Sequence, residues 1–239
     1  MKIFIDAGHN YSGADTGASG YGLREEAVTF EIAEKLAARL TAFGHEAAMS
    51  RKNVTDNVGN TLYESIHGRA EMANRWGADL FICIHCNAYD GKAHGTETFV
   101  YSSQSKAAEY ADRVQKRIVS NVGTTDRGVK ERADLGVLRL TVCPAIYVET
   151  AFIDNMEDNW ILKTKQEEIA KSIFEGVTGQ VAENKTEELT NVNDIVWEYA
   201  HRGIVLDSDG MKKEMDENPD GRLYWLARKA LQYMREHNI

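Results

Sequence analysis

The sequence predicts an α/β fold in which helices flank a mostly parallel central sheet. Short apolar runs, typical of buried strands, alternate along the chain with longer segments of helical periodicity. In addition, several residues suited to chemistry stand at the ends of the predicted strands. Functional groups of open α/β sheets gather at the carboxyl ends of strands, so the two observations support each other.

The first half of the chain reads as strand, loop, helix, strand and helix. The helix over 25–43 is the best supported, because four aliphatic residues recur at every fourth position and Gly44 follows as a stop signal. These residues are Val28, Ile32, Leu36 and Leu40. The predicted elements are a strand over 2–7, a glycine-rich loop over 12–22, a helix over 25–43, a strand over 45–50 and a helix over 60–76.

The second half continues the alternation as far as residue 177. A strongly apolar run over 79–86 predicts a buried strand, and two short apolar runs on either side of Pro144 predict two more. The predicted elements are strands over 79–86, 95–101, 137–140 and 145–149, and helices over 103–121 and 158–177.

The composition then changes, which predicts a division into parts. Residues 1–180 form the predicted main domain, and the polar, charged stretch over 181–191 reads as a linker. Residues 192–239 carry two stretches of helical periodicity with several aromatic residues, and we expect a small helical module there. A segment of this size is near the lower limit for independent folding.

Charge and hydropathy exclude some classes of function. The net charge of −9 over 239 residues argues against a nucleic-acid partner, because phosphate contacts need clustered Lys and Arg. No apolar run approaches the length of a membrane span, and no secretory leader precedes the first strand. We therefore expect synthesis in the cytoplasm. A charged polymer such as cell-wall glycopeptide remains compatible as a substrate, and the oligomeric state is left open.

Four side chains are candidates for a hydrolytic metal site. His9 follows the first strand and a glycine, His85 lies in the apolar strand over 79–86, and Glu149 ends an apolar strand where a bare carboxylate is costly to bury. Glu25 opens a helix, with Glu26 beside it as an alternative ligand that spacing alone does not exclude. Two histidines and a glutamate can hold one zinc ion with an open position, and a second glutamate can then carry a proton.

Two cysteines beside His85 have the spacing Cys83-x-x-Cys86, which can indicate redox chemistry or zinc binding. In a strand, however, residues three apart point to opposite faces of the sheet. We therefore predict two buried, reduced thiols. With only Cys143 as a third cysteine, the chain has no disulfide framework.

Separated motifs in a fixed order resemble the zinc-dependent N-acetylmuramoyl-L-alanine amidases of type 3, which occur in bacterial autolysins and phage endolysins. The resemblance covers roughly residues 2–177, and one departure is Asn10, where a glycine is usual. The motifs are Ile5-Asp6-Ala7-Gly8-His9, Gly22-Leu23-Arg24-Glu25, Arg69-x-x-x-Ala73-Asn74, Ile84-His85-Cys86-Asn87 and Pro144 to Glu149.

The resemblance implies an activity and a role for each residue. It implies hydrolysis of the amide bond between N-acetylmuramic acid and L-alanine in peptidoglycan, after release to the cell wall, with the C-terminal module as a possible wall-binding part. His9, Glu25 and His85 would bind zinc, with the register of the motif favouring Glu25 over Glu26. Glu149 would be catalytic, and Asn87 and Arg139 are candidates for contacts to the substrate.

Two alternative functions remain at this point. One is another zinc peptidoglycan hydrolase, a carboxypeptidase or a deacetylase, which would use the same metal on a different bond. The other is a non-catalytic cell-wall-binding protein. The presence of all four residues, His9, Glu25, His85 and Glu149, argues against the second alternative.

Overall fold

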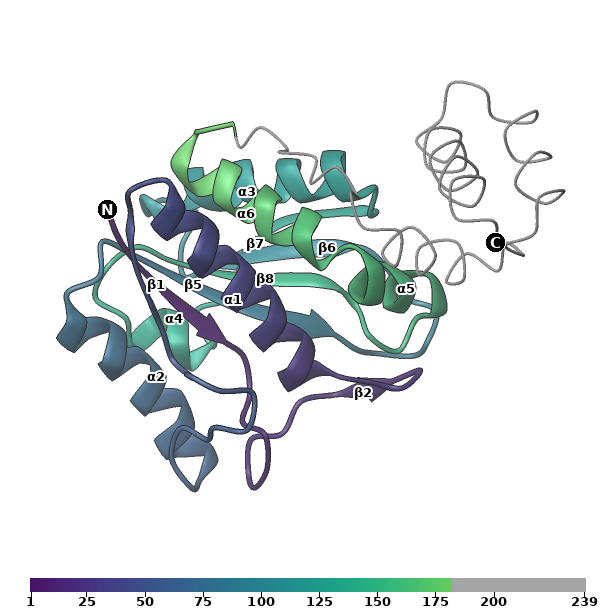
Figure 1. The fold of residues 1–239 in the computed structure, drawn as a ribbon, viewed down its shortest axis with the longest axis horizontal. Helices are drawn as coiled ribbons and strands as arrows, with labels where there is room; N and C mark the ends of the chain where they lie inside the picture. Colours follow the sequence, from purple (N-terminus) through teal and green to yellow (C-terminus); the bar gives the residue numbers. More distant parts are fainter. Residues whose placement is uncertain (182–239) are drawn as a thin grey trace, which may run out of the picture. The chain divides into compact units, whose positions relative to one another are not determined.

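A computed structural model describes residues 1–181 of the chain. A six-stranded sheet lies at the centre of these residues (Figure 1). Its strand order is β4-β1-β5-β8-β6-β7. The first four strands in this order run parallel, whereas β6 is antiparallel to β8 and β7 is parallel to β6. The prediction of a mostly parallel sheet is confirmed. The strands are β1 (Lys2–Ala7), β4 (Glu46–Met49), β5 (Leu80–Asn87), β6 (Thr96–Val100), β7 (Asp126–Glu131) and β8 (Ala145–Phe152).

Helices cover both faces of this sheet and give it two separate cores. The larger core packs α1, α3, α5 and α6 against one face, and Figure 1 shows α1 and α6 lying along it. The smaller core packs α2 and α4 against the other face. The helices are α1 (Glu25–Ala42), α2 (Leu62–Trp76), α3 (Ala107–Val122), α4 (Gly136–Leu140), α5 (Met156–Thr164) and α6 (Gln166–Thr178).

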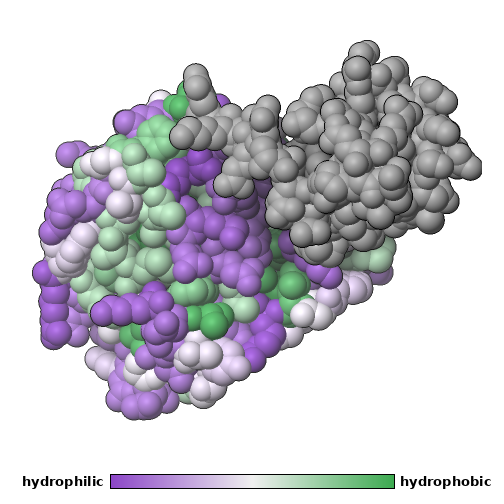
Figure 2. Space-filling model, in the orientation of Figure 1, coloured by the Kyte–Doolittle hydropathy of each residue, from purple (hydrophilic) through white to green (hydrophobic). Residues whose placement is uncertain are grey.

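Helix α1 follows the predicted pattern. Its four regularly spaced aliphatic residues are all buried, and the chain leaves the helix through Gly44 in a left-handed conformation. Acidic side chains such as Glu31 and Glu34 occupy its outer side, and Figure 2 shows that this face of the protein mixes hydrophilic with smaller hydrophobic areas. Burial of the aliphatic stripe fixes the helix on the sheet, and its first residue, Glu25, is thereby held at a fixed place.

Helix α2 is defined at both ends by its sequence. The hydroxyl of Thr61 accepts a hydrogen bond from the backbone N–H of Glu64 at 3.1 Å, and the Glu64 carboxylate accepts one from the backbone N–H of Thr61. This capping box satisfies backbone donors that would otherwise be unpaired. Gly77 ends the helix with a positive φ of 69°. The helix thus presents Arg69 to the sheet in a defined position.

The predicted strand over 137–140 is wrong, because this segment is the short helix α4. Val137 and Leu138 are neighbours in sequence and both are buried, which a helical turn permits and a strand with one buried face does not. The side chain of Asn74 in α2 holds the end of this turn. It donates to the carbonyl of Leu140 at 2.9 Å and accepts the backbone N–H of Val142 at 2.8 Å.

The predicted helix over 158–177 is two helices rather than one. The chain breaks at Lys165, whose φ of −122° is not helical. The ammonium group of Lys165 donates to the carbonyl of Val122 in a neighbouring helix at 2.9 Å, so a tertiary contact accompanies the break. Two further elements were not predicted from the sequence. They are strand β7 and a short hairpin, β2 (Ser19–Gly20) with β3 (Leu23–Arg24), which begins in the glycine-rich loop.

The structure confirms the prediction for the cysteines. Cys83 and Cys86 are free and buried, and they belong to the two different cores on opposite faces of the sheet. Apart from Val181, the predicted linker over 181–191 and the helical module over 192–239 lie outside the described residues.

Candidate metal centre

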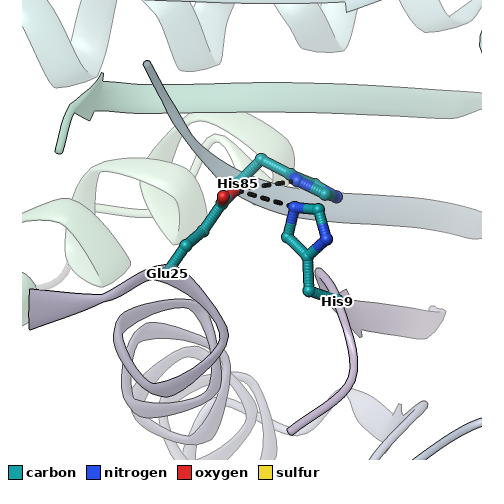
Figure 3. A group of neighbouring side chains, drawn as sticks. All are labelled: His9, Glu25 and His85. Carbon is teal, nitrogen blue, oxygen red and sulfur yellow. Dashed lines mark hydrogen bonds and ion pairs between the residues drawn. The ribbon is translucent and has the colours of Figure 1, made fainter. Parts of the chain in front are cut away.

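Three side chains from different elements meet beside the carboxyl ends of β1 and β5 (Figure 3). His9 follows β1, Glu25 begins α1, and His85 lies near the end of β5. The Oε1 atom of Glu25 lies 3.1 Å from His9 Nε2 and 3.0 Å from His85 Nδ1. One ligand atom from each residue lies within 4.8 Å of the other two, so the three could hold one metal ion.

The backbone around His9 is shaped for this contact. His9 has a positive φ of 66°, a conformation that non-glycine residues adopt rarely and that its surroundings must hold. Gly8 hydrogen-bonds through its N–H to the carbonyl of Ile84 at 3.0 Å, which brings the first strand against the second histidine. A Cβ at Gly8 would lie 2.4 Å from His85 Nε2, so only glycine fits there.

Backbone donors hold the carboxylate of Glu25 on both oxygens. The N–H of Ala18 donates to Oε2 at 2.8 Å, and the N–H of Cys86 donates to Oε1 at 3.0 Å. A Cβ at Gly17 would lie 2.7 Å from Glu25 Cβ, so the close approach of the loop backbone to Glu25 requires glycine at this position. Glu26 points elsewhere and forms an ion pair with Arg24. Of the two glutamates that spacing left open, Glu25 is the one beside the histidines.

The electrostatics of the three residues favour a positive charge between them. Burial alone would lower the pKa of His9, but hydrogen bonds and negative charge from Asp15 and Glu25 outweigh it and raise that pKa to about 10. Burial opposes ionisation of Glu25, but its contacts to His85 and His9 keep its pKa well below the usual range. Burial, together with the charge of His9, lowers the pKa of His85. The cluster therefore favours the protonated form of His9 and the neutral form of His85.

Glu149 lies on the neighbouring strand, paired in register with His85 of β5 on one side and with Glu97 of β6 on the other. Its Oε2 atom is buried and has no hydrogen-bond partner among the described residues. Burial, followed by the negative charges of Glu25 and Glu97, raises the pKa of Glu149 well above its ordinary value. A buried carboxyl group whose Oε2 has no hydrogen-bond partner, next to three candidate ligands, can chemically accept and donate a proton.

The two predicted substrate contacts lie in different surroundings. Asn87 ends β5, and its side-chain amide donates at 2.6 Å to Oε1 of Glu97, the register partner of Glu149 on β6. Arg139 is exposed on α4. In the described part of the chain, its side chain forms no hydrogen bond or ion pair with the cluster of His9, Glu25 and His85.

Three residues that hold the site together were not among those predicted from the sequence. Asp15 hydrogen-bonds His9 Nδ1 at 3.1 Å. The buried guanidinium of Arg69 pairs with Asp6 at 2.7 Å, and that of Arg51 donates to the carbonyls of residues 7, 8 and 26. Arg69 stood in a motif without a role, and nothing in the sequence distinguished Asp15 or Arg51 from ordinary surface charges.

A cavity of about 200 Å³ opens beside the two histidines, between α2, α4 and β8. Its walls are largely apolar and include Leu62, Ile66, Val137 and Tyr147. The ring of Tyr147 stacks on His85 with 4.3 Å between centroids. A larger hollow of about 430 Å³ lies between α1 and α6, away from every candidate residue, so the smaller cavity is the relevant one. None of the helices in the described part is long and apolar enough to cross a membrane.

Comparison with known proteins gives cell-wall amidases and a phage endolysin among the relatives of this chain. The N-acetylmuramoyl-L-alanine amidase LytC of Bacillus subtilis is 38% identical over 180 residues, which are 73% of this chain and 34% of LytC. An uncharacterized cell wall amidase of Bacillus anthracis is also covered over only 34% of its length, so the chain spans about a third of these two relatives. The endolysin of Bacillus phage SPP1 is 33% identical over 237 residues, which are 95% of this chain and 80% of the endolysin.

Solved structures show the same fold. The N-acetylmuramoyl-L-alanine amidase from Clostridium difficile 630 superimposes with a TM-score of 0.65 at 33% identity, covering 74% of this chain and 95% of that one. The catalytic domain of the CD27L endolysin gives a TM-score of 0.67 at 31% identity, with 76% and 99% covered. The family model for N-acetylmuramoyl-L-alanine amidase matches residues 3–179. The chain therefore belongs to the type 3 family of N-acetylmuramoyl-L-alanine amidases.

Proposed function

We propose that the chain hydrolyses the amide bond between N-acetylmuramic acid and L-alanine in peptidoglycan, with zinc bound by His9, Glu25 and His85. The observation that carries this proposal is the buried, unpaired Oε2 of Glu149 next to a set of three metal ligands. Such a pair of features supports hydrolysis, because a metal site alone could be structural.

The donor set fits a catalytic zinc ion. Two imidazole nitrogens and one carboxylate oxygen are the ligands of several hydrolytic zinc sites, which keep a further position open for water or substrate. Asp15 hydrogen-bonds His9, and backbone N–H groups hydrogen-bond Glu25. Hydrogen bonds of this kind orient the ligands in known zinc sites. When bound, a zinc ion would polarise the scissile carbonyl group and lower the pKa of a water molecule.

Glu149 is the proposed proton carrier. The reaction forms a bond between a water oxygen and the lactyl carbonyl carbon, and it breaks the bond from that carbon to the nitrogen of L-alanine. Glu149 takes the proton that the attacking water loses and gives it to the departing nitrogen. Its surroundings suit this task, because Oε2 is not committed to a partner, and the raised pKa of Glu149 favours the protonated form that gives the proton to the nitrogen.

Substrate contacts complete the proposal. The apolar cavity beside the histidines would hold part of the substrate next to the scissile bond. We keep Asn87 and Arg139 as candidate contacts, since Asn87 donates to Glu97 beside Glu149 and Arg139 is exposed on α4. A match of 33% identity over 95% of the chain to a phage endolysin supports an endolysin role. Release from the cytoplasm to the wall and wall binding by residues 192–239 complete this part of the proposal.

The test is digestion of purified cell walls followed by mass spectrometry of the soluble fragments. We expect zinc-dependent release of stem peptides with free L-alanine amino ends. The glycan strands should stay intact. Release of C-terminal residues would instead indicate a carboxypeptidase, and release of acetate a deacetylase. Binding to walls without any of these products, by protein that contains zinc, would favour the non-catalytic alternative.

A further inference from the structure

Asp15 lies in the loop that connects His9 to the β2–β3 hairpin, and both of its carboxylate oxygens are occupied. Oδ1 lies 3.1 Å from His9 Nδ1, and Oδ2 accepts the hydroxyl of Ser65 in α2 at 2.5 Å. The guanidinium of Arg69 lies 3.8 Å from Oδ2. The backbone carbonyl of Asp15 also accepts the N–H of Asn10 at 2.7 Å. These contacts fix the direction in which the carboxylate faces His9.

We propose that Asp15 is a positioning residue for His9 and sets the metal affinity of the site, an inference that depends on the proposed metal centre. When Nδ1–H of a neutral His9 donates its hydrogen bond to the carboxylate of Asp15, the lone pair of the ring lies on Nε2. Nε2 is the nitrogen that faces Glu25, 3.1 Å from its Oε1. The contact therefore fixes both the tautomer and the orientation of the ring, and it makes the imidazole a stronger donor to a cation.

The backbone geometry supports this role. His9 adopts a left-handed conformation with φ of 66°, which a non-glycine residue keeps only where neighbouring contacts enforce it. Asp15 supplies two such contacts, one through its side chain to His9 and one through its carbonyl to the next residue, Asn10. The end of the same loop donates the N–H of Ala18 to Glu25. One short loop thus holds two of the three ligands.

The third ligand is held differently, which makes the effect of Asp15 specific. His85 lies in a strand, its ring stacks on Tyr147, and the side-chain hydrogen bond that the described residues give it is to Glu25. No carboxylate outside the ligand set contacts it in the described part of the chain. Loss of Asp15 should therefore act through His9 and not through His85.

A purely structural role is the competing explanation, because Asp15 also ties its loop to α2 through Ser65. A double-mutant cycle separates the two explanations. The variants are Asp15→Asn, His9→Ala and the combination of both. The matched control is Asp56→Asn, which removes a carboxylate from a neighbouring turn, where Asp56 caps Lys52 and Asn53 and contacts no ligand.

The measurement is the Kd for zinc of each purified full-length variant, by competition with a chromophoric chelator, together with the Tm in the presence of excess EDTA. We expect Asp15→Asn to weaken zinc binding about 10- to 100-fold and Asp56→Asn to change it less than about threefold. In the His9→Ala background, Asp15→Asn should change the Kd by less than about threefold. Cobalt-loaded protein should show an altered visible spectrum for Asp15→Asn and an unaltered one for Asp56→Asn.

Either of two results would overturn the inference. One is a Kd within about threefold of the parent for Asp15→Asn. The other is an equal weakening with and without His9, which would mean that Asp15 acts on the loop or on the general field and not on the ring. If Asp15→Asn also lowers the Tm in EDTA and still weakens zinc binding in the His9→Ala background, the inference is overturned in the same way. Because zinc affinity is measured without peptidoglycan, failure of the proposed hydrolysis would leave this result unaffected.

Discussion

Replacement of Glu149 by glutamine should abolish most of the activity and leave the fold and the metal site intact. The Oε2 atom of Glu149 has no partner among the described residues, so the amide does not break a hydrogen bond at that atom. It also removes a carboxyl group whose ionisation is opposed by burial and by the charges of Glu25 and Glu97. We therefore expect the Tm of Glu149→Gln to be equal to that of the parent or higher, with one zinc ion still bound.

The expected loss of rate follows from the role. General acid–base catalysis contributes about 100- to 10,000-fold, which corresponds to about 3 to 5 kcal/mol of barrier. In this protein the same carboxyl group is proposed to act on both water and leaving nitrogen, so kcat rather than KM should fall. Glutamine occupies the same volume but cannot accept and return a proton.

The assay is release of free L-alanine amino ends from purified peptidoglycan, measured at equal zinc content for the parent and Glu149→Gln. The variant Glu31→Gln, on the outer side of α1, serves as a control for the loss of a carboxylate. Activity of Glu149→Gln within about tenfold of the parent would refute the reasoning, since no other carboxyl group has been assigned this role. Loss of zinc from this variant would show instead that Glu149 is a ligand.

Three further predictions concern the ligands and their supports. Gly17→Ala should weaken zinc binding at least about 10-fold, because its Cβ would lie 2.7 Å from Glu25 Cβ and 2.9 Å from His9 Cδ2; chelator competition that gives the parental Kd would contradict this. Arg69→Met should lower the free energy of unfolding by about 3–5 kcal/mol, because it leaves Asp6 buried and unpaired. Urea titration in EDTA checks it, and a change below about 1 kcal/mol would be inconsistent. The pKa of His9 is raised to about 10, so the proton there is bound at neutral pH and must leave when zinc binds. Apparent zinc affinity should thus fall about tenfold as the pH drops from about 8 to about 7, and calorimetry in buffers of different ionisation enthalpy should detect about one released proton; release of none would count against it.

Long periodic elements could be predicted from the sequence, and short ones could not. The segment that became α1 has a repeating aliphatic stripe, and the strand that became β5 has a long apolar run, so local sequence determines both. Helix α4 is one turn long, and a few apolar residues do not distinguish a turn of helix from a strand. Strand β7 is mainly polar, because it lies at the edge of the sheet and is half exposed.

The candidate ligands could be predicted, whereas their supports could not. His9 follows β1 and His85 lies near the end of β5, where a sheet collects its functional groups, and motif order added Glu25. The expectation that Glu149 ends its strand is wrong, because β8 continues to Phe152. The contact from Asp15 to His9 depends on how a glycine-rich loop folds back on itself, which composition does not determine. The pairs of Arg69 with Asp6 and of Arg51 with the carbonyls of residues 7, 8 and 26 join residues 25 to 63 positions apart, so only the fold reveals them.

The central claim is that the three residues His9, Glu25 and His85 bind a single metal ion. A crystal structure of the zinc-loaded protein, with anomalous data collected on both sides of the zinc edge, tests it most directly. We predict one anomalous peak at about 2.0–2.2 Å from one nitrogen of each histidine and from a carboxylate oxygen of Glu25. A peak bound by other side chains, or protein that binds no zinc while its fold is intact, would contradict it.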